Sequence, residues 1–208
     1  KSNDSIFITG QSGKGKTFCA SNLLPPLAML GSRIAVFDVS KSFTRGELLR
    51  VLPAEVIDSL FEFVEIGMEE EKIPVNPLYI GDCSGLPARK RRIVSLIKAA
   101  AGKLNQCDAK ILTGIISDML KKDAKSPSIS IEMLHSTLKS GGKTGAMVHD
   151  LISGLLNDIE RIGCEDQGWS NLFDSSKKIV VFSLGDEVGD NVHALLDILI
   201  SSVFEWQR

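Results

Sequence analysis

The amino-acid sequence predicts an α/β protein whose core is a parallel sheet. Two continuous apolar runs, Arg33–Val39 and Lys178–Leu184, suit strands that are buried on both faces, as the strands of parallel sheets are. A further strand is expected at Ser5–Thr9, and a helix over Lys16–Leu24 separates it from the Arg33–Val39 run. Strand, crossover helix and strand make a βαβ unit, which is right-handed by default.

The first strand runs into a glycine-rich loop. Residues 10–17 fit the pattern G-x-x-x-x-G-K-[ST], with Gly10 and Gly15 as its two glycines. Glycine adopts backbone angles that a Cβ forbids, so successive N–H groups can converge on one anion. The Lys16 ammonium can reach the β- and γ-phosphates of a nucleotide, and the Thr17 hydroxyl can ligate Mg²⁺. The helix that starts near Lys16 directs its positive end toward the phosphates.

This loop is therefore expected to bind ATP together with Mg²⁺. Lys16 and Thr17 are the expected catalytic residues of the loop, and Thr17 is the expected metal ligand. The residues expected to bind the nucleotide are Gly10, Gln11, Ser12, Gly13, Lys14, Gly15, Lys16, Thr17 and Phe18.

The composition is that of a globular domain able to bury a core, with 208 residues of which 43% are hydrophobic and 24% charged. A net charge of -2 supplies no global attraction to nucleic acid. The longest apolar runs fall short of a membrane span and no signal peptide precedes the first strand, so we expect a cytoplasmic protein. The four cysteines form no C-x-x-C pair and are expected to be reduced core thiols: Cys19, Cys83, Cys107 and Cys164.

A change of pattern follows the first part of the chain. Apolar residues recur at helical spacing in four successive stretches, which are Ile93–Leu104, Ile111–Leu120, Ile131–Leu138 and Met147–Ile159. Four consecutive helices are more than one crossover needs, so we interpret them as a helical insertion that serves packing. A last helical stripe follows the Lys178–Leu184 strand.

Three regions are predicted from this order. They are the N-terminal part of a core at residues 1–82, the helical insertion at 83–165, and a strand and helix that return to the core at 166–208. The linker at the start of the third region carries Trp169, Leu172 and Phe173. Because the chain starts at Lys1, almost on its first strand and without an initiator methionine, we expect a piece of a longer protein.

Several lesser signals have two interpretations each. Pro25-Pro26 should kink or end the first helix. Asp38 ends its strand either as a turn residue, which is favoured, or as part of a phosphate site or subunit contact. The basic run at residues 89–92 is either a solvated helix end, which is favoured, or a contact for DNA phosphates or a neighbouring subunit's nucleotide.

Two further motifs are assigned no chemistry. Gly142-Lys143-Thr144 ends like the glycine-rich loop but lacks the first glycine and a preceding strand. His135, His149 and His193 are scattered without cysteine partners, so a structural metal is not expected, and His149-Asp150 is interpreted as a helix-surface pair.

Together these residues resemble the HerA/FtsK group of P-loop ATPases, and within it the conjugation (type IV secretion) ATPases. The likeness covers nearly the whole chain, but the glycine-rich loop is its one sharp motif. The other matches are looser: Val36-Phe37-Asp38 leading to Lys41-Ser42-Phe43, Asn76-Pro77-Leu78, and Leu172-Phe173-Asp174 before Ile179-Val180-Val181-Phe182. The resemblance implies a RecA/FtsK-like parallel-sheet core with a helical insertion.

In function, the resemblance implies an ATP-driven motor that is usually hexameric and moves DNA or drives transfer of a secretion substrate. A motor attached to a DNA restriction or modification system is a related possibility within the group. Such ATPases need an Asp on a strand to hold Mg²⁺ and a nearby Glu to orient the attacking water. Asp186 and Glu187 are the candidates, although Ser183 occupies the position where the strand should deliver the acid. The favoured interpretation is instead that the acidic pair lies on a later strand, beyond this chain.

Two classes of function follow. The first is the ATP-binding core of a ring-forming motor, which is an ATPase in the full-length protein even if this piece is inactive. The second is a nucleotide-gated interaction module whose helical insertion docks partners without turnover of its own. A small-molecule kinase is a weaker third interpretation, because the long apolar insertion suits packing rather than a second substrate pocket.

Overall fold

The structure, a computed structural model, describes most of the chain. The described residues are 8, 11, 13–66, 73, 75–79, 85–101, 104–122, 128–162, 168–175, 177–184 and 192–207. Their contacts divide the chain into two compact units. The sheet unit comprises Lys1–Ile66 and Phe173–Gly185, and the helical unit comprises Gly67–Leu172 and Asp186–Arg208.

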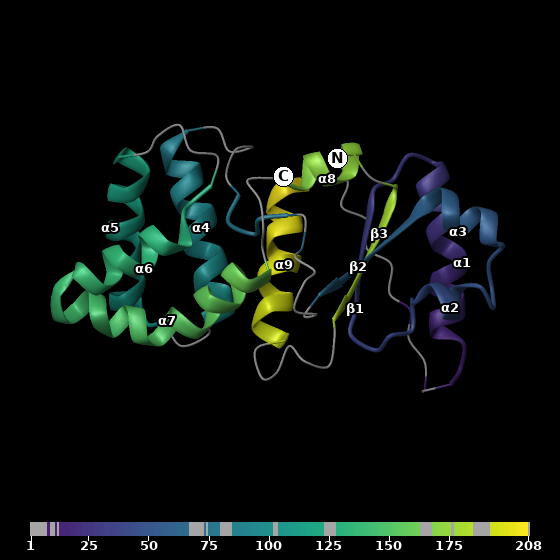
Figure 1. Cartoon of the computed structure of the whole chain (residues 1–208), viewed down its shortest axis with the longest axis horizontal. Coiled ribbons are helices and arrows are strands. Elements are labelled where there is room, and N and C mark those ends of the chain that lie inside the picture. Colours follow the sequence, from purple (N-terminus) through teal and green to yellow (C-terminus); the bar gives the residue numbers. More distant parts are fainter. Residues whose placement is uncertain are drawn as a thin grey trace. The chain divides into compact units, whose positions relative to one another are not determined.

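The sheet unit is built on parallel strands, as the sequence predicted. Its described strands are β1 (Ile34–Asp38), β2 (Phe61–Ile66) and β3 (Ile179–Leu184), in the order β1-β3-β2 (Figure 1). The central strand β3 is apolar and buried on both faces at residues 179–182, which explains its continuous hydrophobic run. Of the predicted first strand, Ser5–Thr9, the structure describes Ile8 alone.

Three helices accompany the sheet in this unit: α1 (Lys16–Met29), α2 (Arg45–Leu48) and α3 (Ala54–Leu60). α1 continues through Pro25 and Pro26 to Met29, so of the two expected effects, a kink or an end of the helix, the end near Leu24 is wrong. The prolines remove two backbone donors, but Pro25 and Ala28 are buried, and Ala28 packs into a cluster with residues of α2, α3, β2 and β3. Burial of that face offsets the missing hydrogen bonds.

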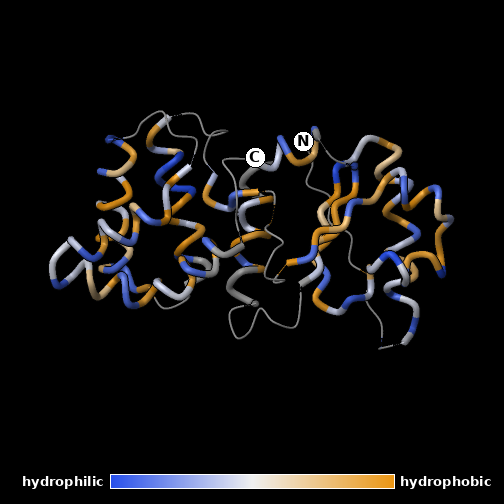
Figure 2. Tube along the Cα trace, viewed as in Figure 1, coloured by the Kyte–Doolittle hydropathy of each residue, from blue (hydrophilic) through white to orange (hydrophobic). Residues whose placement is uncertain are grey.

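The helical unit contains α4 (Leu86–Ala101), α5 (Gln106–Lys122), α6 (Ile131–Ser140), α7 (Gly142–Ile162) and α9 (Val192–Gln207). Figure 2 shows apolar and polar residues alternating along these helices, as the predicted stripes require. α9 packs on α4, and the contacts group Asp186–Arg208 with the helices. The sequence-based division had assigned this last helix to the core instead.

The predicted linker around Trp169 is a short helix, α8 (Trp169–Ser175), rather than irregular chain. Trp169 is buried, and its indole Nε1–H donates to Ser202 Oγ on α9 at 3.0 Å. The guanidinium of Arg92 on α4 lies 3.4 Å from the carbonyl oxygen of the same Ser202. These buried polar contacts join α4, the start of α8, and α9 inside the helical unit.

α6 and α7 meet at a tight turn at Gly141, and the Gly142-Lys143-Thr144 triplet begins α7. Gly142 has φ 69°, in the left-handed region that favours glycine. A Cβ built on Gly145 would lie 2.5 Å from the carbonyl oxygen of Leu138, so only glycine lets the two helices approach this closely. The triplet is therefore part of a helical hairpin. Its glycine adopts the left-handed conformation at the junction of the two helices, although its sequence resembles the end of a phosphate-binding loop.

Candidate polyphosphate site

The candidate site is the glycine-rich loop before α1. Gly13 and Gly15 have φ 74° and 78°, so both occupy the left-handed region that a Cβ disfavours. The backbone carbonyl of Gln11 accepts hydrogen bonds from the backbone N–H of Lys14 at 3.3 Å and from Lys16 Nζ at 2.8 Å. The loop thus curls around one carbonyl, and the Lys16 ammonium is held over the loop.

α1 begins directly at the end of this loop, with Gly15 as its N-cap residue. The first helical bond runs from the N–H of Cys19 to the carbonyl of Gly15 at 2.9 Å. Among the described residues no side chain caps this end of α1, and its first turn contains no acidic residue. Thr17 is exposed, and Phe18 is 60% exposed. A helix end of this kind can bind an anion through backbone N–H groups and the helix dipole.

Some of the predicted site residues cannot be placed. Gly10 and Ser12 of the loop and the acidic pair Asp186 and Glu187 lie outside the described residues. Their binding and catalytic roles stay predictions. The described end of β3 pairs Ser183 with Asp38 of β1 on one side and with Glu65 of β2 on the other.

Asp38 organises the turn after β1. Its side chain is buried, and Oδ1 accepts hydrogen bonds from Ser40 N (3.1 Å), Ser40 Oγ (3.0 Å) and Ser42 N (3.2 Å), while Oδ2 accepts from Phe43 N (2.7 Å). These bonds hold Lys41 in the left-handed region, with φ 56°. The favoured interpretation of Asp38 as a turn residue is what the structure shows.

The turn after β1 lies at the same edge of the sheet as the glycine-rich loop. α1 runs from the loop to the start of β1, and β1 runs back to Asp38, so both segments lie at the carboxyl ends of the strands (Figure 1). This is the edge at which open parallel sheets bind ligands. A short-range pattern, Asp-x-Ser-x-Ser after a strand, is the sequence signal for such a side-chain-to-backbone turn.

The structure also shows the surroundings of other residues from the sequence analysis. Arg92 is buried against the Ser202 carbonyl of α9, so one member of the basic run at residues 89–92 is a packing residue. Cys19 and Cys107 are exposed free thiols, which corrects the expectation that they are core residues. No described helix is long and apolar enough to cross a bilayer.

Sequence reasoning missed one pairing altogether. His135 on α6 and His149 on α7 were treated as scattered, yet their rings meet with Nδ1 of His135 2.9 Å from Nε2 of His149. The expectation that the histidines stand apart is therefore wrong for these two. No local spacing could have shown it, because the residues are fourteen positions apart on two helices.

Comparison with known proteins gives a likeness at the level of the fold. No family model and no curated protein matches the sequence. The structure is similar to that of VirB4 of Thermoanaerobacter pseudethanolicus, with a TM-score of 0.58 and 14% sequence identity. The alignment covers 96% of this chain and 56% of the VirB4 chain, so this chain spans little more than half of that protein's length.

Proposed function

We propose that this chain is the ATP-binding core of a motor ATPase of the conjugation, secretion or DNA-processing type. The observation that carries the proposal is the loop at residues 11–16, where two left-handed glycines and the Lys16 ammonium stand at the start of α1. The sequence resemblance to conjugation ATPases supports the motor class, and the fold-level likeness to VirB4 supports the same class.

The residues present fit a nucleotide polyphosphate with Mg²⁺. The backbone N–H groups of the loop and of the first turn of α1 would bind phosphate oxygens, and Lys16 would supply a compact positive charge. Thr17 is exposed at the start of α1, where its hydroxyl would ligate Mg²⁺. Mg²⁺ held there would supply positive charge that offsets the negative charge developing on the phosphates during phosphoryl transfer.

Hydrolysis would further require a residue that orients the attacking water. Asp186 and Glu187 follow the central strand β3 in the sequence and are our candidates for this acidic pair. Asp38 is a poor substitute, because both of its carboxylate oxygens already accept hydrogen bonds from the turn that follows it. The full-length protein would hydrolyse ATP. It would do so as a homo-oligomer, which is a hexamer in the implied family, and it would act on DNA or a secretion substrate.

The test compares two lysines that each stand in a Gly-Lys-Thr triplet. Lys16→Ala removes a charge-assisted bond to phosphate that contributes about 1.5–3 kcal/mol, so the affinity for a fluorescent ATP analogue should fall by about tenfold or more. Lys143→Ala alters the exposed lysine at the start of α7 and should leave that affinity unchanged. Equal affinity of the Lys16→Ala variant and the original chain would show that the loop does not bind the nucleotide.

The second candidate, a nucleotide-gated interaction module without turnover, is favoured by the use of Asp38 in a turn. At the described carboxyl ends of β1 and β3, Asp38, whose carboxylate is already bonded within that turn, lies opposite a serine, Ser183, in the strand pairing. Steady-state ATPase activity of the full-length protein, with and without DNA, separates the two. Turnover that DNA stimulates supports the motor, and a flat rate near zero supports the module.

A further inference from the structure

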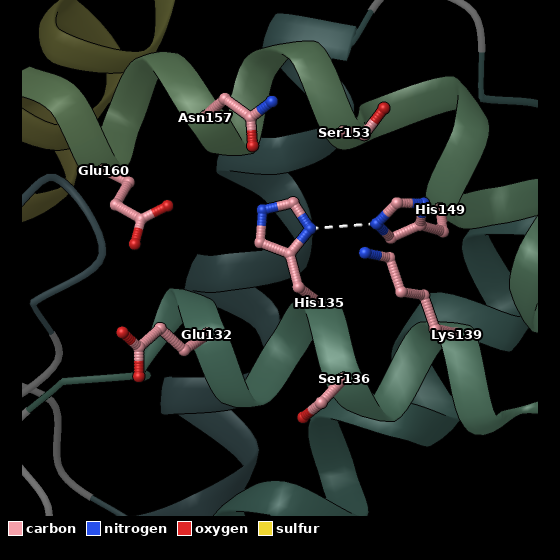
Figure 3. A pocket seen from close by; sticks show the side chains of 8 residues that line it. All are labelled: Glu132, His135, Ser136, Lys139, His149, Ser153, Asn157 and Glu160. Carbon is pink, nitrogen blue, oxygen red and sulfur yellow. Dashed lines mark hydrogen bonds between the residues drawn. The ribbon is translucent and has the colours of Figure 1, made fainter.

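Two histidines of the helical unit face each other across neighbouring helices. Nδ1 of His135 on α6 lies 2.9 Å from Nε2 of His149 on α7, and the ring planes are inclined at 62° with centroids 5.1 Å apart (Figure 3). The tight turn at Gly141 and the close approach at Gly145 hold the two helices together beside this contact. The pair is thus built by the hairpin rather than by flexible surface chain.

The rings border an open cavity of about 620 Å³ whose lining residues are of polar types. Its lining combines carboxylates, hydroxyls, an amide and an ammonium: Glu132, His135, Ser136, Lys139, His149, Ser153, Asn157 and Glu160 (Figure 3). A volume of this size holds several water molecules, since one water in the liquid occupies about 30 Å³. Small oxygen ligands therefore have direct access to the two imidazoles.

The outer ring nitrogens face polar groups as well. Nδ1 of His149 lies 3.6 Å from a carboxylate oxygen of Asp150. Nε2 of His135 is buried on the side of Asn157 and Glu160, and no described group makes a hydrogen bond of good geometry to it (Figure 3). The pair thus offers three positions for a proton, one between the rings and one on each outer nitrogen.

Two neutral imidazoles carry only two protons between them, so one of the three positions stays empty. In the neutral pair one outer nitrogen therefore carries a lone pair instead of a proton.

We propose that His135 and His149 form a two-histidine site for a divalent transition-metal ion, with Nδ1 of His135 and Nε2 of His149 as the protein ligands. Metal–imidazole bonds of about 2.0–2.1 Å place two nitrogens about 2.9–3.3 Å apart at bond angles of 90–109°. At those bond angles each lone pair lies about 35–45° off the line between the two nitrogens, so the observed 2.9 Å separation needs rotations of that order in both rings, toward the cavity. Water in the cavity completes the coordination.

Metal binding by the two neutral rings requires no release of a proton. The central proton moves to the outer nitrogen that lacked one, and both inner lone pairs then bind the metal. Each outer N–H faces an acceptor, Asp150 for His149 and the Asn157–Glu160 side for His135, which is the usual support of a metal-bound histidine. Of the charged side chains that line the cavity, the carboxylates of Glu132 and Glu160 offset the added charge, whereas the ammonium of Lys139 opposes it.

The site supplies two protein ligands and no more. Within the described part of the chain no group of three or more histidine, cysteine, aspartate or glutamate side chains is arranged to hold a metal. Binding should therefore follow the intrinsic order of divalent ions, with Cu²⁺ bound more tightly than Ni²⁺ or Zn²⁺. A bound ion would join α6 to α7 and stabilise the hairpin.

The test titrates the whole chain with CuCl₂. One Cu²⁺ per chain should bind, its electron paramagnetic resonance spectrum should show coupling to two imidazole nitrogens, and the midpoint of thermal unfolding should rise. His135→Ala and His149→Ala should each weaken binding at least tenfold. His193→Ala, which changes the third histidine of the sequence, is the matched control and should bind as the original chain does.

Two outcomes would overturn the proposal. Undiminished binding by the double variant His135→Ala/His149→Ala would place the ion elsewhere. A spectrum of the unaltered chain without coupling to two imidazole nitrogens would do the same, and it needs no variant that could fail to fold. Because the nucleotide loop belongs to the other unit, Lys16→Ala should retain Cu²⁺ binding, so failure of either proposal leaves the other standing.

Discussion

The sheet unit and the helical unit build their candidate sites in different ways. In the sheet unit the loop around Gly13 and Gly15 is shaped by backbone conformation, and its ligand would bind mainly to main-chain N–H groups. In the helical unit the pair of His135 and His149 is made of side chains that two helices bring together. A backbone site depends on local sequence, whereas a side-chain site depends on the packing that positions its helices.

The largest effect is expected where the hairpin is tightest. Gly145→Ala places a Cβ 2.5 Å from the Leu138 carbonyl oxygen, and we expect a loss of about 3 kcal/mol because backbone must move. Gly154→Ala on the same helix meets open space and should stabilise by about 0.5–1 kcal/mol. Urea unfolding measures both. Equal stability of the two variants would show that α6 and α7 do not approach as closely as described.

A smaller loss is expected at the turn after β1. Asp38→Ala leaves the N–H groups of Ser40, Ser42 and Phe43 without their acceptor, and about 2 kcal/mol of stability should be lost, part of it recovered by hydration of the exposed turn. Asp38→Asn keeps one side-chain oxygen acceptor and should lose less. Chemical unfolding of the two variants gives the ranking, and the reverse order would contradict the hydrogen-bond account.

A change in the loop should separate binding from stability. Gly15→Ala forces a Cβ into the left-handed region at φ 78°, which costs about 1–2 kcal/mol. We expect the loss of binding free energy for the nucleotide to be larger than the loss of unfolding free energy, while Cu²⁺ binding is retained. Gly46→Ala on α2, which has open space for a Cβ, is the control for both measurements. Loss of Cu²⁺ binding in Gly15→Ala would show that the two sites are coupled.

The smallest effect is a pH dependence of the metal-free protein. The folded pKa of His135 lies below the ordinary value of 6.5, so the unfolded chain binds more protons as the pH falls through this range. The stability contributed by neutral His135 is complete above pH 6.5 and is lost as the pH falls toward the folded pKa. The charged or polar groups facing His135 are His149, Lys139, Glu160 and Asn157. Unfolding free energies measured across pH 5–8 should show this slope in the original chain and not in His135→Ala.

The sequence alone determined the features that depend on neighbours along the chain. The parallel strands β1 and β3, the helical stripes and the spacing of the glycine-rich loop are local patterns, so the α/β class followed from them. The continuation of α1 through Pro25-Pro26, by contrast, depended on burial of Pro25 and on the packing of Ala28 against other elements. A local rule about proline could not include that compensation.

Only the tertiary structure decided the features that join distant residues. Arg92 and Trp169 meet at Ser202, α9 packs on α4, and His135 meets His149, although nothing in the spacing of these residues relates them. Side-chain partners across helices are set by which faces pack and at what separation, and that separation here depends on a single missing Cβ at Gly145. The loop can thus be recognised from eight consecutive residues, whereas the histidine pair exists only once the hairpin has closed.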